Sequence, residues 1–477
     1  MKTIVGRNAE IALMNEYVSS DRAEFVAVFG RRRVGKTFLV DSLFHDAYAF
    51  SVTGVVDGES EVQMQAFVDA LEMYGYALEQ KPVDWFDAFV CLRKFLISRI
   101  KPNEKCIVFI DELPSLDVKG YKLVQALGYF WNSWASKQDN LTLIVCGSST
   151  SWMIRNIIDN KGGLHDRITH EIHLHPFSLK ETEEYLLSIG CQWDRLSVVQ
   201  AYMIFGGIPY YLSLLRSDLS LSQNVDRLFF SRGAELRREF HRLFATLFRQ
   251  PDTYISIIRL LASHKSGLTR EEIVSHLGNA DNGHISDKLE DLVNCDFIRR
   301  YNVKKKKISS KSGIYQLMDF FTLFYLSFAE KETVDEHFWT NHLNTPEVNS
   351  WLGLAYERVC MAHVAQIKHR LHIDSISTEY YSWRSLPNEG RPQAQIDLII
   401  ERADRVINLC EIKYSDSEYS LQKDEYLRFM NRLSVFREET GTRFAVWPTF
   451  ITTYGLLQGS YASSVPVQLT ADDLFEF

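Results

Sequence analysis

A glycine-rich segment near the N-terminus has the residue types and spacing of a phosphate-binding loop. Gly30, Gly35, Lys36 and Thr37 fit the pattern G-x-x-x-x-G-K-[ST], and the apolar run 25–29 precedes them. Glycines let the backbone curl so that successive N–H groups point at one centre, where the following helix adds the positive end of its dipole. We expect Lys36 to reach the β- and γ-phosphates of ATP and the Thr37 hydroxyl to ligate Mg²⁺. The segment therefore predicts nucleotide binding, with a simple turn as the alternative.

A second acidic site supports this prediction. The continuous apolar run 106–110 is typical of a buried strand, and Asp111 and Glu112 follow it directly. In this Walker B pattern Asp111 would hold Mg²⁺, and Glu112 would orient or deprotonate the attacking water. A further apolar run, 141–147, brings Ser148 to the same sheet edge. Ser148 is a candidate sensor of the γ-phosphate, and an ordinary turn residue is the alternative.

A third group of charged residues lies in the last quarter of the chain. Glu357 belongs to a helical stretch, Asp397 to an apolar strand, and Glu411 and Lys413 to the strand that follows a short hairpin. The strand period of two puts Glu411 and Lys413 on one face, where Asp397 can meet them. Two carboxylates at such a place can hold Mg²⁺ or Mn²⁺ against a scissile phosphate, while the lysine positions water or stabilises developing charge. The D-x(n)-E-x-K spacing predicts a PD-(D/E)xK nuclease-like site with Glu357 as supporting acid, and a chance match in a strand is the alternative.

The composition is that of a globular protein of several domains. The chain has 477 residues, of which 46% are hydrophobic and 24% are charged, so two to four domains are expected. No segment approaches the ~20 apolar residues that span a bilayer, and no signal-like apolar core follows the N-terminus, which predicts a cytoplasmic protein without a membrane partner. Seven cysteines are scattered without C-x-x-C pairs, so they are interpreted as reduced core residues.

The charge is distributed unevenly along the chain. The formal net charge is −8, but residues 231–310 carry fifteen Lys and Arg against ten Asp and Glu. Residues 345–477 carry thirteen against eighteen. The middle of the chain is therefore the better candidate for a surface that binds a polyanion such as DNA.

The order of apolar patterns predicts a multidomain α/β fold. Strands alternate with helices up to about residue 175, which indicates a P-loop parallel sheet over 1–175. Helical periodicity then predicts a helical lid over 176–235, a winged-helix domain over 236–335 and an α/β restriction-endonuclease-like domain over 345–477.

The winged-helix prediction rests on three short helices and a basic hairpin. The helices are expected at 254–261, after the cap at Thr269, and at 285–293, and the strands at 297–303 and 312–317 flank Lys304 to Lys307. The lysines would contact DNA phosphates without reading sequence, or the fold only packs against its neighbours. The aromatic run 320–328 is expected in a core. Further along, Tyr381, Trp383 and Arg384 either flank a nucleic-acid strand or pack.

With these motifs in order, the chain resembles archaeal-type ATPases of the STAND/AAA+ kind that carry a nuclease-like C-terminal domain. The matching segments are 5–10 (VGRNAE), 30–37 (GRRRVGKT), 110–114 (IDELP), 164–167 (LHDR), 206–210 (GGIPY) and the E…ID…EIK set. The resemblance implies that Gly6 and Arg7 lie near the adenine. It also implies that Arg167 is the γ-phosphate arginine, acting in cis or from a neighbouring subunit of a homo-oligomer. Asp166 stands where the family commonly has a small residue, and Gln395 stands where relatives often have an acid.

These considerations define the expected site residues. The predicted nucleotide-binding residues are Gly6, Arg7, Gly30, Arg33, Gly35, Lys36, Thr37, Phe38, Asp111 and Ser148. The predicted catalytic residues are Glu112, Arg167, Asp397, Glu411 and Lys413, and the predicted metal ligands are Thr37, Asp111, Asp397, Glu411 and Glu357.

Three function classes compete on this basis. The first is an Mg²⁺-ATP-dependent switch or motor that engages DNA and carries a nuclease module. The second is a regulatory or adaptor ATPase whose acidic C-terminal domain binds a partner without cutting. The third, a small-molecule kinase, lacks an evident acceptor pocket.

Overall fold

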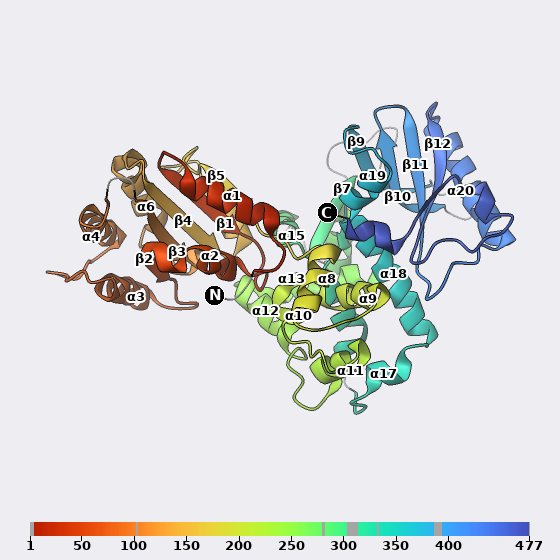
Figure 1. Ribbon diagram of the computed structural model, residues 1–477, viewed down its shortest axis with the longest axis horizontal. Helices are drawn as coiled ribbons and strands as arrows, with labels where there is room; N and C mark the ends of the chain where they lie inside the picture. The colour runs from red at the N-terminus through yellow and green to blue at the C-terminus, as the bar shows by residue number, and fades with distance from the viewer. Residues whose placement is uncertain are drawn as a thin grey trace. The chain divides into compact units, whose positions relative to one another are not determined.

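The computed structural model describes residues 4–101, 104–278, 282–302, 313–331, 333–385 and 394–476. It divides into two compact units, Met1–Pro176 and Phe177–Phe477 (Figure 1). The finer subdivision of the second unit into lid, winged helix and nuclease-like domain stays a prediction.

The first unit is built on a five-stranded parallel sheet in the order β2-β3-β4-β1-β5. The strands are β1 (Glu24–Phe29), β2 (Tyr48–Thr53), β3 (Cys106–Asp111), β4 (Leu141–Gly147) and β5 (His170–His173). Every residue of β1, β3 and β4 is buried, as expected for the centre of a sheet covered on both faces. The predicted parallel sheet is therefore confirmed.

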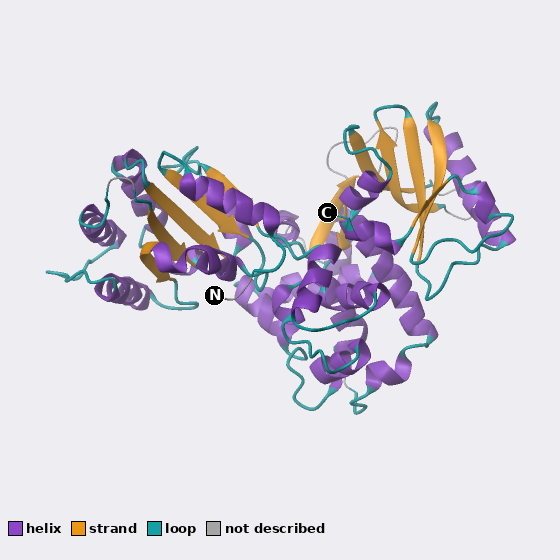
Figure 2. Ribbon diagram, in the orientation of Figure 1, coloured by secondary structure: helices purple, strands orange, loops and turns teal. Residues whose placement is uncertain are grey.

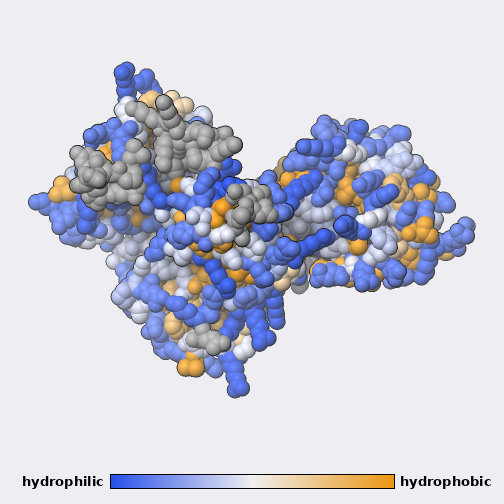
Figure 3. Space-filling model, turned by 180° about the vertical axis from the view of Figure 1, so that it is seen from behind, coloured by the Kyte–Doolittle hydropathy of each residue, from blue (hydrophilic) through white to orange (hydrophobic). Residues whose placement is uncertain are grey.

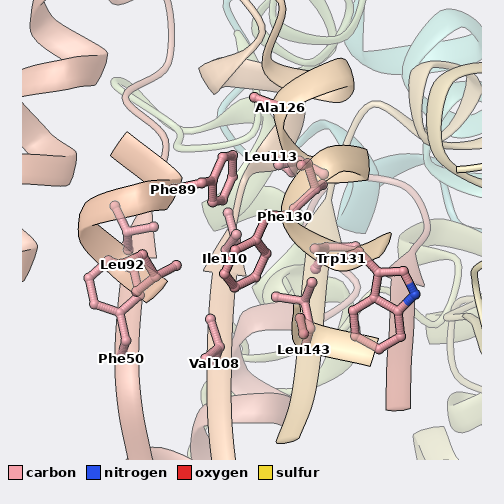
Figure 4. Packing of buried hydrophobic residues seen from close by; sticks show 14 of the residues in the cluster. Phe50, Phe89, Leu92, Val108, Ile110, Leu113, Ala126, Phe130, Trp131 and Leu143 are labelled. Carbon is pink, nitrogen blue, oxygen red and sulfur yellow. The ribbon is translucent and has the colours of Figure 1, made fainter. Parts of the chain in front are cut away.

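Helices cover both faces of this sheet (Figure 2). They are α1 (Asn8–Ser19), α2 (Lys36–Phe44), α3 (Ser60–Met73), α4 (Trp85–Ile97), α5 (Leu113–Leu116), α6 (Leu123–Ser133) and α7 (Thr150–Met153). One face packs against α1 and α2, and the other packs against α3, α4 and α6. On the second face Phe89 and Phe130 stack with ring centroids 5.3 Å apart above Val108 and Ile110 of β3 (Figure 4). This packing holds the strand that ends at Asp111.

The second unit begins with a helical segment, residues 177–248. Its helices are α8 (Leu179–Ser188), α9 (Arg195–Phe205), α10 (Pro209–Leu212), α11 (Leu221–Val225) and α12 (Glu239–Leu247). A capping box between Ser178 and Glu181 starts α8, and Gly206 in the left-handed conformation ends α9. The helical periodicity of this part of the sequence is therefore confirmed.

Residues 251–317, called the middle module below, contain three helices and a small antiparallel sheet. The elements are α13 (Pro251–Ser263), β6 (Leu268–Thr269), α14 (Arg270–Leu277), α15 (Asn282–Asn294), β7 (Ile298–Asn302) and β8 (Gly313–Leu317), with the sheet in the order β6-β8-β7. Thr269 and Glu272 form the predicted capping box of α14. The predicted basic run Lys304 to Lys307 lies outside the described residues.

The predicted aromatic run is part of a core. It forms α16 (Phe320–Phe324) and the turn that follows, and α17 (Phe338–His342) comes next. Phe324 lies against Phe229, Trp339 and Trp351, with ring centroids 4.8, 5.0 and 5.4 Å away. The segment therefore ties the helical segment to the part of the chain that follows.

Residues 346–476, the C-terminal module, form a mixed five-stranded sheet with helices on both faces. Its elements are α18 (Pro346–Ala362), α19 (Val364–Arg370), β9 (Thr378–Arg384), β10 (Gln395–Arg402), β11 (Val406–Lys413), α20 (Lys423–Thr440), β12 (Ala445–Thr452) and β13 (Val467–Leu469). The order is β13-β12-β11-β10-β9, antiparallel from β9 to β11 and parallel from β11 to β13. Phe429, Leu433 and Phe436 of α20 pack on one face, and α18 contacts β11.

A buried histidine joins the C-terminal module to the helical segment. His363, at the end of α18, donates from Nδ1 to the Val359 carbonyl (2.8 Å) and accepts the Leu179 amide on Nε2 (3.0 Å). The Leu179 N–H lies in the first turn of α8, so this N–H has no acceptor within its own helix. Burial lowers the pKa of His363 to about 4, so the ring is neutral and can serve both bonds at once.

Exposed large apolar side chains are spread along the described part of the chain, among them Met73, Val83 and Val334. The face seen in Figure 3 is mainly hydrophilic, with scattered hydrophobic residues. Among the described residues, no helix combines the length and the apolar character needed to cross a membrane.

We expect replacement of His363 by leucine to destabilise the second unit. The change leaves the Leu179 amide buried without an acceptor, which costs about 1–3 kcal/mol. The folded pKa of His363 lies below the ordinary 6.5. The contribution of its neutral ring to stability is therefore complete above pH 6.5 and is lost as pH falls through about 4. Thermal unfolding of both proteins across this range is the measurement, with His363→Gln, which keeps an acceptor, as the partial rescue. A constant difference between wild type and His363→Leu at every pH would contradict the assignment.

Candidate nucleotide site and carboxylate site

The glycine-rich loop joins β1 to α2 with the geometry that its glycines permit. Gly30 has φ 147°, and a Cβ added there would lie 2.2 Å from the Leu174 carbonyl oxygen. Gly35 has φ 92° and is the residue before α2, which begins at Lys36 as predicted. Both positions therefore require glycine, the first because of close backbone approach and the second because of its backbone angle. The loop stands at the carboxyl end of β1, where open α/β sheets bind ligands.

Two predicted magnesium ligands already contact each other. The Thr37 hydroxyl, in the first turn of α2, donates to Asp111 Oδ2 at 2.9 Å. Burial raises the pKa of Asp111, because a buried carboxylate loses hydration. Lys36 is buried, and its ammonium group donates to the carbonyls of Gly30 (2.9 Å) and Arg31 (3.0 Å). The structure thus brings the predicted lysine, threonine and aspartate together at one loop.

Glu112 and Ser148 form a second contact at the same edge. Ser148 donates to Glu112 Oε2 from its hydroxyl (2.9 Å) and from its backbone amide (3.3 Å). Glu112 has φ 46°, a left-handed conformation that costs a residue with a Cβ about 1–3 kcal/mol and that clusters at functional sites. The end of β4 requires glycine at position 147, because a Cβ there would lie 2.7 Å from the Pro114 ring. Ser148 therefore holds Glu112 here, a contact that the sequence did not predict.

The remaining predicted nucleotide-binding residues have different environments. Gly6 and Arg7 have positive φ values of 67° and 59° just before α1. Arg7 is buried, and its guanidinium donates to the carbonyls of His175 (2.6 Å) and Val34 (3.3 Å). Arg7 therefore fixes the backbone of the phosphate-binding loop at Val34.

Three further predicted residues differ in exposure and backbone. Arg33 lies within the loop with φ 75°, and Phe38 is 43% exposed on α2. Arg167 lies in an exposed turn, and its role as the γ-phosphate arginine stays a prediction.

A family comparison bears on this part of the chain. Residues 4–215 match the model of an ATPase domain found predominantly in Archaea. Together with the complete loop at Lys36 and the contact between Thr37 and Asp111, this match supports a P-loop ATPase domain. The matched residues are called the ATPase domain below. The match extends beyond the first unit into α8, α9 and α10.

The ATPase domain and the rest of the chain also have relatives. An uncharacterized protein of Methanocaldococcus jannaschii is 27% identical over 423 residues, which are 86% of this chain and 88% of that protein. Among solved structures, the Walker-type ATPase of Pyrococcus abyssi is similar over 68% of this chain and 96% of its own, with 17% identity and a TM-score of 0.46. The ORC2 protein of Aeropyrum pernix, in complexes with ADPNP and ADP, is similar over 68% and 94%, with 13% identity and a TM-score of 0.43.

We expect the Glu112→Gln variant of the ATPase domain to bind ATP but to hydrolyse it about 10²–10⁴-fold more slowly. The amide keeps the hydrogen bond from Ser148 but cannot accept a proton from water. Lys36→Ala, in contrast, should lose nucleotide binding, because the ammonium group is removed. Binding of a fluorescent ATP analogue and release of phosphate measure the two steps separately. Wild-type turnover by Glu112→Gln would remove Glu112 from the catalytic residues.

The C-terminal module contains a carboxylate site formed by α18, β10 and β11. The predicted hairpin between β10 and β11 is present, with Leu398 opposite Cys410 and Ile399 opposite Leu409. The pairing of β10 with β9 shifts register between Ile396 and Ile399, so Asp397 lies in a bulge. Such bulges re-aim side chains next to functional sites. No pattern in the sequence predicted this irregularity.

Hydrogen bonds orient two of the carboxylates. Glu411 Oε1 contacts Lys413 Nζ at 3.0 Å and Arg432 Nη2 at 2.9 Å. Gln395 donates from Nε2 to Asp397 Oδ1 at 2.7 Å. The residue that departs from the family pattern therefore positions the aspartate instead of adding a charge.

The third carboxylate, Glu357, is close enough to the others to be affected by them. Burial, the charge of Asp397 and a smaller contribution from Glu411 raise its pKa to about 8. Arg358 and Lys413 act in the opposite direction. The three predicted carboxylates and the lysine therefore influence one another electrostatically, and their role in a nuclease site stays a prediction.

Two cations of this site were missed by the sequence analysis. Arg432 comes from α20, about twenty residues after Glu411, and Arg358 is the fully buried neighbour of Glu357. Both arginines lie in helices whose residue pattern is that of an ordinary amphipathic helix. The sequence offered one signal for Arg432: helical spacing puts it beside Phe429, which lies one turn earlier and is buried.

Tyr381, Trp383 and Arg384 of β9 pack against the rest of the protein. Tyr381 is buried and donates to Glu401 Oε2 at 2.7 Å. Trp383 is buried edge-to-face against Phe436. Arg384 donates to the Ser266 carbonyl at 2.7 Å. Of the two alternatives left open for these residues, packing is the one that the structure adopts.

We expect Glu357→Gln to stabilise the protein in alkaline solution without metal. The folded pKa of about 8 lies above the ordinary 4.5, so the favourable contribution of the protonated acid is complete below 4.5 and is lost as pH rises through about 8. Glutamine mimics the protonated acid at every pH. Thermal unfolding in EDTA should therefore give equal midpoints at acid pH and a higher midpoint for the variant at about pH 9. Glu336→Gln, at an exposed carboxylate of the same unit, is the control, and parallel curves for Glu357→Gln and wild type would contradict the prediction.

Proposed function

We propose that this protein is an Mg²⁺-dependent ATPase that engages DNA and carries a metal-dependent nuclease module. The observation that supports the nuclease assignment is the convergence of Glu357, Asp397, Glu411 and Lys413 in the C-terminal module.

In the ATPase domain, each residue has a separate task. The backbone amides of the loop and Lys36 bind the phosphates, and the pair Thr37 and Asp111 offers oxygen ligands of the type that Mg²⁺ prefers. Mg²⁺ held there would neutralise charge on the β- and γ-phosphates. Glu112 would take the proton of the attacking water after its hydrogen bond with Ser148 is broken.

The carboxylate site fits a divalent cation on electrostatic grounds. Three acidic side chains lie close enough that two of them raise the pKa of the third, which is the arrangement that a divalent cation relieves. A hard cation bound by these oxygens would activate water and stabilise the charge on a phosphodiester. Lys413 would hold that water or the phosphate, while Arg432 keeps Glu411 in place.

The middle module is the proposed DNA contact. Its three helices and hairpin follow the winged-helix order, in which the third helix, here α15, can enter a major groove. The excess of basic residues between 231 and 310 favours a phosphate backbone as partner. Since no base-reading side chain is identified, the contact is proposed as independent of sequence.

A regulatory or adaptor ATPase is the second candidate. It is favoured by the acidic balance of residues 345–477, which disfavours nucleic acid over much of that surface. In this case the C-terminal module would bind a partner protein, and the carboxylate cluster would be a remnant without catalytic use.

We expect wild-type protein to cleave DNA in Mg²⁺ or Mn²⁺ and Glu411→Ala to lose cleavage by at least about 100-fold, because the ligand that Lys413 and Arg432 orient is removed. Single- and double-stranded DNA, with and without ATP, are the substrates, and Lys36→Ala reports whether nucleotide controls cleavage. Equal cleavage by wild type and Glu411→Ala would reject the nuclease site. No cleavage under any condition, with ATP still bound, would favour the adaptor.

A further inference from the structure

A turn of the middle module forms one wall of the carboxylate site. Within the second unit, a pocket of about 420 Å³ lies between Lys265 and Ser266 on one side and Glu357, Asp397 and Gln395 on the other. Ser350 of α18 also lines it. Its volume falls in the range of ligand pockets, about 300–1,000 Å³. The proposed nuclease site is therefore bounded by two modules of the chain.

The turn is held by its backbone carbonyls. The Lys265 carbonyl accepts hydrogen bonds from Gln316 Nε2 (2.8 Å) and from Arg358. The Ser266 carbonyl accepts from Tyr301 (2.8 Å) and Arg384 (2.7 Å).

Four side chains from β7, β8, β9 and α18 thus fix two adjacent peptide groups. Gly267 follows with φ 76°, and a Cβ there would lie 2.5 Å from the Tyr315 carbonyl oxygen. The position of the turn does not depend on the side chain of Lys265.

The side chain of Lys265 has no comparable anchor. It is exposed, and its ammonium group donates to the Ser350 hydroxyl at 3.3 Å. Within the described residues, no ion pair holds it. Lys265 and Ser266 therefore line a pocket that Glu357 and Asp397 also line.

Such a pocket suits an anionic ligand that lies between Lys265 and a cation held by the carboxylates. A phosphodiester has this property, because one oxygen can bind a divalent cation held by the carboxylates while another accepts from an ammonium or hydroxyl group. An uncharged ligand would leave the cation site and Lys265 without a common partner. A free carboxylate would satisfy Lys265 but would not explain a site beside a nuclease-like cluster.

We propose that Lys265 and Ser266 of the middle module bind the phosphodiester of the nucleic-acid strand that lies against the carboxylate site of the C-terminal module. This inference rests on the proposed function, because it assumes that the carboxylates act on a polynucleotide. It adds a phosphate-binding wall that comes from outside the D-x(n)-E-x-K motif. Lys265 is a positioning residue here, and its task is to hold the strand.

The test measures strand binding separately from cleavage. Full-length wild type, Lys265→Met and Lys265→Arg are titrated into a fluorescein-labelled single strand and a labelled duplex in Ca²⁺, at several salt concentrations. Lys331→Met is the matched control, since Lys331 is an exposed lysine that contacts α18 through Glu347, one turn before Ser350. Cleavage in Mn²⁺ gives KM and kcat for the same proteins and for Glu411→Ala.

We expect Lys265→Met to weaken strand binding and to raise KM, each about tenfold. The slope of the logarithm of the binding constant against the logarithm of salt concentration should become smaller by about one, as for the loss of one phosphate contact. Lys265→Arg should stay near wild type, and Lys331→Met should not change. All variants should unfold at the wild-type temperature, because the carbonyl contacts of the turn remain.

Three results would overturn the inference in distinguishable ways. Wild-type binding and KM for Lys265→Met, with Glu411→Ala inactive, would reject the phosphate-binding wall and leave the nuclease function intact. Absence of cleavage together with a Lys265-dependent loss of strand binding would reject the nuclease function and support the wall. No strand binding by the wild type would reject both.

Discussion

Three mostly buried carboxylates that interact electrostatically need positive charge nearby, and the C-terminal module supplies it. Glu357, Asp397 and Glu411 come from three different elements, and burial, together with the charge of Asp397 and a smaller effect of Glu411, raises the pKa of Glu357 to about 8. Lys413 and Arg432 lie on Glu411, and the buried Arg358 lies beside Glu357. Arg358 in turn reaches the Lys265 carbonyl. The electrostatics of the carboxylate site thus extends to the contact between the middle and C-terminal modules.

The nucleotide site solves a related problem with backbone groups. Lys36 is buried, and its charge is stabilised by the carbonyls of Gly30 and Arg31 instead of by a carboxylate. Asp111, also buried, keeps the Thr37 hydroxyl as partner, and Glu112 keeps Ser148. These side chains are thus positioned by contacts within the loop and at the ends of neighbouring strands.

The helical segment and the C-terminal module are joined by polar as well as aromatic contacts. His363 accepts the Leu179 amide at the start of α8, and Tyr414, directly after β11, accepts from Gln200 of α9 at 2.7 Å. Arg195 of α9 pairs with Asp472 near the C-terminus at 3.0 Å. Because the family match of the ATPase domain reaches residue 215, these contacts lie on helices that belong to that match. The Gln200 contact lies one residue beyond the end of β11, where Lys413 lies.

The sequence by itself determined the local elements and the chemistry of the loop. Glycines at 30 and 35, a lysine and a threonine at fixed offsets, a buried strand that ends in Asp111 and another that Ser148 follows are local patterns. Local patterns can be recognised without knowledge of the fold. The E…ID…EIK set also gave the carboxylates, since strand periodicity fixes which side chains share a face. Only the tertiary structure decided that Ser148 holds Glu112, that Gln395 orients Asp397, that Tyr381 and Trp383 are buried, and that Arg432 and the 265–266 turn reach the carboxylate site. These are contacts between residues far apart in the chain or set by a bulge, and they depend on packing of whole elements, which no spacing in the sequence encodes.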